Sequence, residues 1–164
     1  MGSRSSITQK ATERAYIAGF LDGDGSVMLQ IKKRGDSKRG WRFMATICFY
    51  QDTRHEQPLH WIRNCFGIGY ISHRSDGMTE LRINGYDQCE RVLRTLSPYI
   101  RFKRIQIDAL LQALAILRVQ SVDALRVAEK RFLVSCIETI QNQNYQSRRK
   151  RSKEQLEQIL GLTP

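Results

Sequence analysis

The most constraining feature of this sequence is the stretch AYIAGFLDGDG, in which small side chains recur along one face of a predicted helix. Helical spacing over residues 12–21 places four residues at positions i, i+3, i+4 and i+7 of that face: Ala15, Ala18, Gly19 and Asp22. A glycine inside a helix costs about 1 kcal/mol relative to alanine, so a face this bare requires a reason. Close approach of another backbone is the usual one. We therefore predict that this face contacts a second helix.

Directly after this helix the sequence places two aspartates between glycines, as Asp22-Gly-Asp24-Gly, and then changes to the period of two typical of a strand. Asp-Gly pairs are common turn residues, so a plain connection between helix and strand is one interpretation. A calcium-binding EF-hand loop is excluded, because its sixth position would be Val27 and its twelfth Lys33, where glycine and glutamate are needed. The other interpretation is that the carboxylates belong to a site.

The chain has 164 residues, the length of one domain, and a formal net charge of +11. Because lysine and arginine release counterions when they neutralise phosphates, this charge favours nucleic acid as the partner. No apolar run approaches the roughly 18 to 20 residues of a membrane span, so no membrane association is expected. The four cysteines form no CxxC pair, which argues against a zinc site or a disulfide framework and favours free thiols in a reducing compartment.

Hydrophobic periodicity and turn residues predict an alternation of helices and strands. Apolar and polar residues alternate over 27–32 and 41–51, and a further hairpin over 67–85 turns at Asp76-Gly77. Four later segments have helical spacing: 58–66, 87–96, 104–117 and 123–140. The order predicts the α+β fold class, with a four-stranded antiparallel sheet covered by helices on one face only.

The uncovered face of the sheet is expected to be polar and cationic. Seven basic residues gather in its two hairpins: Lys32, Lys33, Arg34, Lys38, Arg39, Arg42 and Arg74. A polar sheet face is often only solvated, but a two-stranded ribbon of this charge also fits the major groove of duplex DNA.

The motif IAGFLDGDG, residues 17–25, resembles the signature of the LAGLIDADG homing endonucleases. The element order, FYQDT at the end of the second strand and PYIRFKRIQ at the start of a helix are also similar to the homodimeric, single-motif branch found in chloroplast group I introns. The resemblance covers about residues 12–118 well and the C-terminal helices more loosely. It implies the αββαββα LAGLIDADG fold, with a saddle-shaped sheet.

The sequence contains one copy of the motif, which in this family implies a homodimer whose two motif helices pack around a two-fold axis. The resemblance places the metal-binding carboxylate at Asp24, with the carbonyl of Gly23 as a second ligand, and implies Mg²⁺ as the cofactor. It places Gln51 and Lys103 in the active site, where they position or polarise the attacking water. Asp22 is then expected to cap and orient the turn.

The sequence contains three histidines. His55 stands four positions after Gln51, where the resemblance implies an arginine with an auxiliary role in the active site. The histidine leaves open whether this position has that role here. His60 and His73 lack the spacing of metal ligands and are expected on the surface or in the DNA groove.

The resemblance also implies a double-stranded DNA target that is read by the polar face of the sheet. Arginine pairs well with guanine and glutamine with adenine, and each such contact gives about 1–3 kcal/mol of discrimination. The side chains expected to contact DNA are Met28, Gln30, Lys32, Arg34, Lys38, Arg39, Arg42, Thr46, Cys48, Tyr50, Ser72, Arg74, Glu80 and Arg82.

The implied function is site-specific homing endonuclease activity, in which a homodimer makes a metal-dependent double-strand break in a long pseudo-palindromic DNA site and leaves short 3′ overhangs. Two alternatives stay open: a non-cleaving protein of the same fold, acting as an intron maturase or a DNA- or RNA-binding regulator, and a generic basic RNA-binding α+β domain. The presence of Asp24, Gln51 and Lys103 favours the nuclease. The expected compartment is an organelle, either chloroplast or mitochondrion, or a bacterial cytoplasm.

The expected domain organisation has three parts. Residues 1–11 are expected to form a flexible N-terminal arm, residues 12–145 the endonuclease domain, and residues 146–164 a basic C-terminal tail with a short helix that starts in a capping box at Ser152. The run Arg148–Arg151 in this tail is either a solvated charge cluster or a contact to DNA phosphates.

Overall fold

A computed structural model describes residues 3–35, 38–144 and 150–162, with only the backbone described for residues 3–9. The first half of the chain contains α1 (Ser3–Asp24), β1 (Gly25–Lys33), β2 (Trp41–Asp52), the 3₁₀ turn η1 (Thr53–His55), α2 (Gln57–Phe66), β3 (Tyr70–His73) and β4 (Met78–Asn84). The second half contains α3 (Tyr86–Leu96), η2 (Ser97–Tyr99), α4 (Arg104–Leu117), η3 (Val122–Ala124), α5 (Val127–Gln143) and α6 (Lys153–Ile159).

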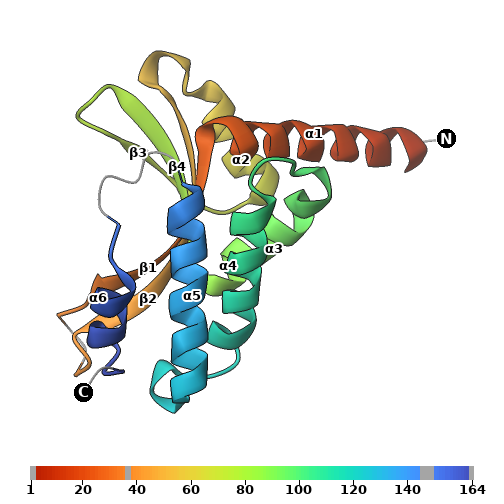
Figure 1. Ribbon diagram of the computed structural model, residues 1–164. Coiled ribbons are helices and arrows are strands. Elements are labelled where there is room, and N and C mark those ends of the chain that lie inside the picture. Colours follow the sequence, from red (N-terminus) through yellow and green to blue (C-terminus); the bar gives the residue numbers. More distant parts are fainter. Residues whose placement is uncertain (1–2, 36–37, 145–149, 163–164) are drawn as a thin grey trace.

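The four strands form one antiparallel sheet in the order β1-β2-β4-β3, and the predicted α+β class is confirmed. Val27, Ile47 and Ile83 lie side by side in the register, and all three are buried on the face that packs against the helices. Figure 1 shows α3, α4 and α5 gathered on one side of this sheet. The predicted hairpin turn is also confirmed, since Gly77 at its tip adopts φ 79°, a conformation that favours glycine.

The core lies between the sheet and the helices, where Leu21, Phe49 and Leu93 are completely buried. Burying a large apolar side chain contributes about 1.5–3 kcal/mol, so this layer supplies much of the stability. α1 is 22 residues long. Neither it nor any other helix among the described residues is apolar enough to cross a bilayer.

Two helices begin more than one residue away from the predicted start. α1 starts at Ser3 instead of Thr12, because no glycine or proline interrupts the sequence between Ser3 and Gly19. Its N-terminal part extends past the other helices in Figure 1. α5 starts at Val127 instead of Asp123, because Arg126 and Glu129 form a capping box there.

The C-terminal segment packs along the free edge of β1. Asn144 Nδ2 donates to the backbone oxygen of Val27 (3.3 Å), and Arg151 Nη1 donates to that of Ile31 (2.7 Å). These bonds satisfy carbonyl groups that an edge strand otherwise leaves unpaired. The predicted capping box of Ser152 at α6 is confirmed, and Leu156 is buried. Arg148 lies outside the described residues.

Replacing the buried Ile47 by alanine is expected to lower the free energy of unfolding by about 2–5 kcal/mol, because a cavity opens in the middle of the sheet. The matched control is Ile105→Ala, since Ile105 is 54% exposed on α4. That control should change stability by about 0.5 kcal/mol or less. Urea denaturation of both variants measures the difference, and equal losses would contradict the described core.

Candidate active site and nucleic-acid interface

The motif helix ends at one side of the sheet. Asp24 is the last residue of α1, and both Gly23 and Asp24 are exposed there. The chain turns directly into β1 at Gly25, where an added Cβ atom would lie 2.8 Å from the backbone oxygen of Leu21. Glycine is therefore required at this junction by close approach of the helix backbone. The outcome is a carboxylate held at the C-terminal end of a helix.

Asp24, Gln51 and Lys103 line one groove, although they come from the ends of α1 and β2 and from the residue before α4. Gly25 pairs with Phe49 in the sheet, so Gln51 lies two residues beyond the end of this pairing, beside the motif helix. All three residues that the resemblance selected thus line the same groove. Arg74 and Met78 line the same groove.

Asp22, two residues before Asp24 in α1, also lines this groove but is only 6% exposed. Its carboxylate accepts hydrogen bonds from three successive backbone N–H groups, those of Arg101 (2.6 Å), Phe102 (3.2 Å) and Lys103 (3.0 Å). These groups precede the first residue of α4, so Asp22 caps the start of that helix and not its own turn. No local spacing in the sequence signals this contact across 79 residues.

The side chain of Lys103 also contacts Asp22. Its ammonium group donates to the backbone oxygen of Asp22, near the end of α1. Partial burial lowers the pKa of Lys103, and the carboxylates of Asp22 and Asp24 partly oppose that shift. A lysine in this setting gives up a proton more readily than a lysine in water.

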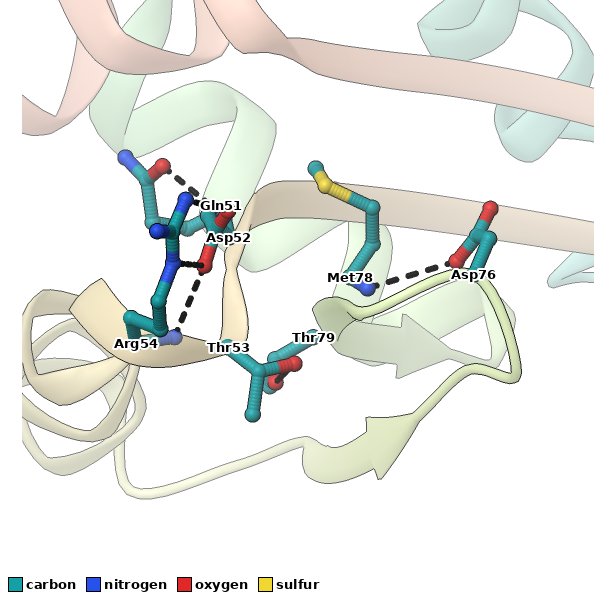
Figure 2. A network of polar contacts seen from close by, with 7 residues as sticks. All are labelled: Gln51, Asp52, Thr53, Arg54, Asp76, Met78 and Thr79. Atoms are coloured by element: carbon teal, nitrogen blue, oxygen red, sulfur yellow. Dashed lines mark hydrogen bonds and ion pairs between the residues drawn. The ribbon is translucent and has the colours of Figure 1, made fainter.

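The end of β2 is held by short-range polar contacts (Figure 2). The Gln51 Oε1 atom accepts from the backbone N–H of Asp52 (2.9 Å), and the Asp52 carboxylate binds Arg54 Nη2 (2.8 Å) and Nε (3.0 Å). The guanidinium of Arg54 lowers the pKa of Asp52. His55 is exposed in η1 and is not among the residues that line the groove.

A second polar cluster, which the sequence did not reveal, is centred on Glu56. Its carboxylate accepts from Thr79 Oγ1 (2.7 Å) and contacts Nε2 of His73 (2.7 Å) and of His60 (3.4 Å). The Thr79 hydroxyl is the main cause of a lowered pKa of Glu56. Both histidines are thus engaged with a carboxylate, and the described residues contain no group of three acidic, histidine or cysteine side chains suited to a metal ion.

Several predicted DNA contacts lie on the polar face of the sheet with free side chains. Gln30, Lys32 and Arg42 face away from the core, and among the described residues they have no hydrogen-bond or ion-pair partner. Lys32 and Arg42 are cross-strand neighbours, as are Gln30 and Met44. This part of β1 and β2 is therefore available to a ligand.

Other residues that were predicted to contact DNA are buried or already paired within the chain, and the buried ones are corrected here. Thr46 and Cys48 are 0% exposed, and the Thr46 hydroxyl donates to Asn84 Oδ1 (2.8 Å). Glu80 is also buried and holds Arg82 in an ion pair (2.6 Å). Arg39 binds Asp123 through two hydrogen bonds of 2.7 and 2.6 Å, so it ties the first hairpin to η3.

The face of α1 that exposes small side chains differs from the predicted contact face. Ala18 is 0% exposed and Asp22 6%, so both pack inside this chain, whereas Ala15 and Gly19 are exposed. The exposed positions with small side chains are Thr12, Ala15, Gly19 and Gly23. Added Cβ atoms at either of these two glycines would meet nothing within 4 Å. Nothing described within this chain therefore requires glycine at these two positions.

A scan of known families matches residues 17–112 to the model described as LAGLIDADG endonuclease. The chain belongs to the LAGLIDADG endonuclease family. It is 33% identical over 98 residues to DNA endonuclease I-CvuI of Chlorella vulgaris, which covers 60% of this chain and 61% of that protein. It is 24% identical over 147 residues to DNA endonuclease I-CreI of Chlamydomonas reinhardtii, which covers 88% of this chain and 86% of that protein.

Solved structures confirm the LAGLIDADG fold. I-CvuI in complex with the I-CreI target superposes with a TM-score of 0.82 at 24% identity, over 93% of this chain and 95% of that one. The archaeal intron-encoded I-Vdi141I complexed with DNA gives 0.77 at 18% identity, over 93% and 96%. At these identities the superpositions establish the fold.

The oxygen atoms at the end of the motif helix suit a hard divalent cation. Gly23 and Asp24, at the negative end of the α1 dipole, are exposed residues that line the groove. Mg²⁺ keeps several of its waters and is commonly bound by only one or two carboxylates, so a site with few protein ligands fits this ion.

Cys48 should resist modification in the folded protein. It is fully buried, and burial raises the pKa of its thiol to about 11, whereas Cys65 is exposed. A maleimide should label Cys65 first and leave Cys48 unmodified until the chain unfolds, as read by peptide mass spectrometry. Cys65→Ser removes the fast reaction as a control. Rapid labelling of Cys48 would show that this position is open to ligands.

Proposed function

We propose that this protein is a site-specific homing endonuclease that works as a homodimer. It makes a metal-dependent double-strand break in a long pseudo-palindromic DNA site and leaves short 3′ overhangs. The observation that carries this proposal is the single groove lined by Asp24, Gln51 and Lys103 in a chain of this family. The relatives in DNA complexes support the choice of substrate.

Mg²⁺ is the cofactor we propose, held by the carboxylate of Asp24 and the carbonyl of Gly23. When bound, such an ion lowers the pKa of water and neutralises charge on the phosphate. The amide of Gln51 can orient the attacking water by hydrogen bonds, and the Lys103 ammonium supplies positive charge beside the phosphate. An I-CvuI complex was crystallised with 2 mM Mg and another with 2 mM Ca, which supports a divalent ion for that relative.

Two copies of the chain are required to cut both strands of the DNA, since each copy supplies one exposed motif carboxylate. The exposed small residues of α1 (Thr12, Ala15, Gly19, Gly23) allow a second α1 to approach closely around a two-fold axis. Their spacing of three and four residues keeps them on one helix face. The two ends that carry Asp24 then lie near each other at the centre of the dimer.

Base recognition is assigned to the free part of the sheet face. Gln30 and Arg42 carry the groups that pair with adenine and guanine, and Lys32 adds phosphate or base contacts. The buried Thr46 and Cys48 are left out of this proposed contact surface.

The compartment we propose is an organelle or a bacterial cytoplasm. All four cysteines are free thiols in the structure, and three of them are buried. Free thiols are typical of reducing compartments.

A randomised duplex library incubated with the protein and Mg²⁺ tests the function. The wild type is expected to cut one long, nearly palindromic site. Asp24→Asn is expected to bind that site but to cut it at least about 10³-fold more slowly, because the metal ligand is lost. Sequencing of the new ends reads the site and the overhang. Bound but uncut wild-type reactions would favour a non-cleaving DNA-binding protein, and cutting by Asp24→Asn at the wild-type rate would exclude its proposed role.

Gly19→Leu is expected to weaken the dimer at least about 30-fold, because overpacking costs about 1–3 kcal/mol per copy and the interface contains the substitution twice. Sedimentation velocity over a range of concentrations measures the change. Arg131→Leu adds an exposed leucine on α5 instead and should leave the dimer intact. An unchanged dimer in Gly19→Leu would rule out this face of α1.

A further inference from the structure

The loop before α4 is held by hydrogen bonds to the Asp22 carboxylate. Arg101 and Phe102 are exposed, with Phe102 82% exposed, so their side chains do little to anchor the loop. The three N–H bonds to the buried Asp22 carboxylate hold this stretch of backbone against α1. Without them the loop would lose its principal polar contacts to the motif helix.

Both oxygens of Asp22 are used. Oδ2 accepts from Arg101 and Phe102, and Oδ1 accepts from Lys103. Asparagine has only one acceptor oxygen, and its NH₂ group would face an N–H donor. A residue that only formed a turn would not need two acceptor oxygens. A carboxylate is therefore specifically suited to position 22.

Lys103 is tied to Asp22 at both of its ends. Its backbone N–H binds the Asp22 carboxylate, and its ammonium group binds the Asp22 backbone oxygen. Asp24 lies two residues further along the same helix end and lines the same groove. The position of the ammonium group relative to Asp24 is therefore set by contacts to Asp22.

We propose that Asp22 is a positioning residue that acts through Lys103: it fixes the loop before α4 and thereby holds the Lys103 ammonium group beside the end of the motif helix. This inference rests on the proposed endonuclease function. It gives the first aspartate of the motif a role in the reaction that is separate from metal binding and from a turn of its own.

A double-mutant cycle tests whether Asp22 acts through Lys103. Under single-turnover conditions with saturating DNA, Asp22→Asn is expected to cut about 10- to 100-fold more slowly while its DNA affinity stays within about threefold of the wild type. In a Lys103→Met background the same substitution should slow cleavage by less than about threefold, because the residue through which it acts is gone. Losses that multiply in the double variant would overturn the proposal.

The matched control is Glu90→Gln. Glu90 is a buried carboxylate too, but it holds Arg94 and Arg118 between α3 and α4, away from the groove residues. Its effect on the cleavage rate should be small and should be the same with and without Lys103. A loss as large as that of Asp22→Asn would mean that general destabilisation, and not positioning, explains the result.

A second measurement needs neither DNA nor cleavage. Acylation of lysines by acetic anhydride, read by mass spectrometry, reports how freely each ammonium group is reached. Relative to the exposed Lys33 and Lys38, Lys103 should react several-fold faster in Asp22→Asn than in the wild type. An unchanged ratio would overturn the positioning role. A wild type that cuts no DNA would defeat the proposed function, while the acylation ratio still decides whether Asp22 places Lys103.

Discussion

The structure depends first on the packing of the last turns of α1 against the sheet. Ile17, Ala18 and Leu21 are at most 1% exposed, and Phe20 stacks on Phe49 of β2 at 6.0 Å between ring centroids. With these side chains buried, α1 cannot rotate about its axis without exposing apolar area to water. That exposure costs about 25 cal/mol of free energy per Å². The inward and outward faces of the motif helix are set by this contact.

Two consequences follow for the site. Asp22 is turned inward, where its carboxylate caps α4 and brings Lys103 to the helix end, while Gly23 and Asp24 remain at the exposed end of the helix. The opposite, outward face presents small side chains with open space above Gly19 and Gly23. Packing inside one chain thereby determines both the geometry of the groove and the surface that we propose for the second copy.

The polar face of the sheet is divided in a similar way. Across β2, β4 and β3, side chains satisfy one another: Thr46 binds Asn84 at 2.8 Å, and Asn84 in turn binds Tyr70 at 3.3 Å. Over β1 the side chains of Gln30 and Lys32 have no such partners among the described residues. A network that is already satisfied gains little from a new ligand, which is why the base contacts that we propose are assigned to the free part.

Sequence reasoning was strong where a local pattern determines the structure and weak where distant residues meet. Strand alternation, the turn at Gly77 and the capping box at Ser152 were predicted correctly, because each depends on neighbours in the chain. The residues Gln51 and Lys103 came only from the family resemblance, since their spacing carries no signal. The face of α1 was misplaced because glycine and alanine suit either side of a helix, and apolar spacing alone did not decide which side is buried.

What the amino-acid sequence determined by itself is the order of the main helices and strands, the excess of positive charge and the family motif with its two aspartates. Only the tertiary structure decided which of the two motif aspartates is buried and which arginines are already paired with carboxylates. It also decided which positions of the sheet face are covered. The physical reason is that hydrogen bonds and burial at these positions join residues far apart in the chain, such as Asp22 with Arg101 and Arg39 with Asp123. Those contacts exist only after the helices have packed on the sheet.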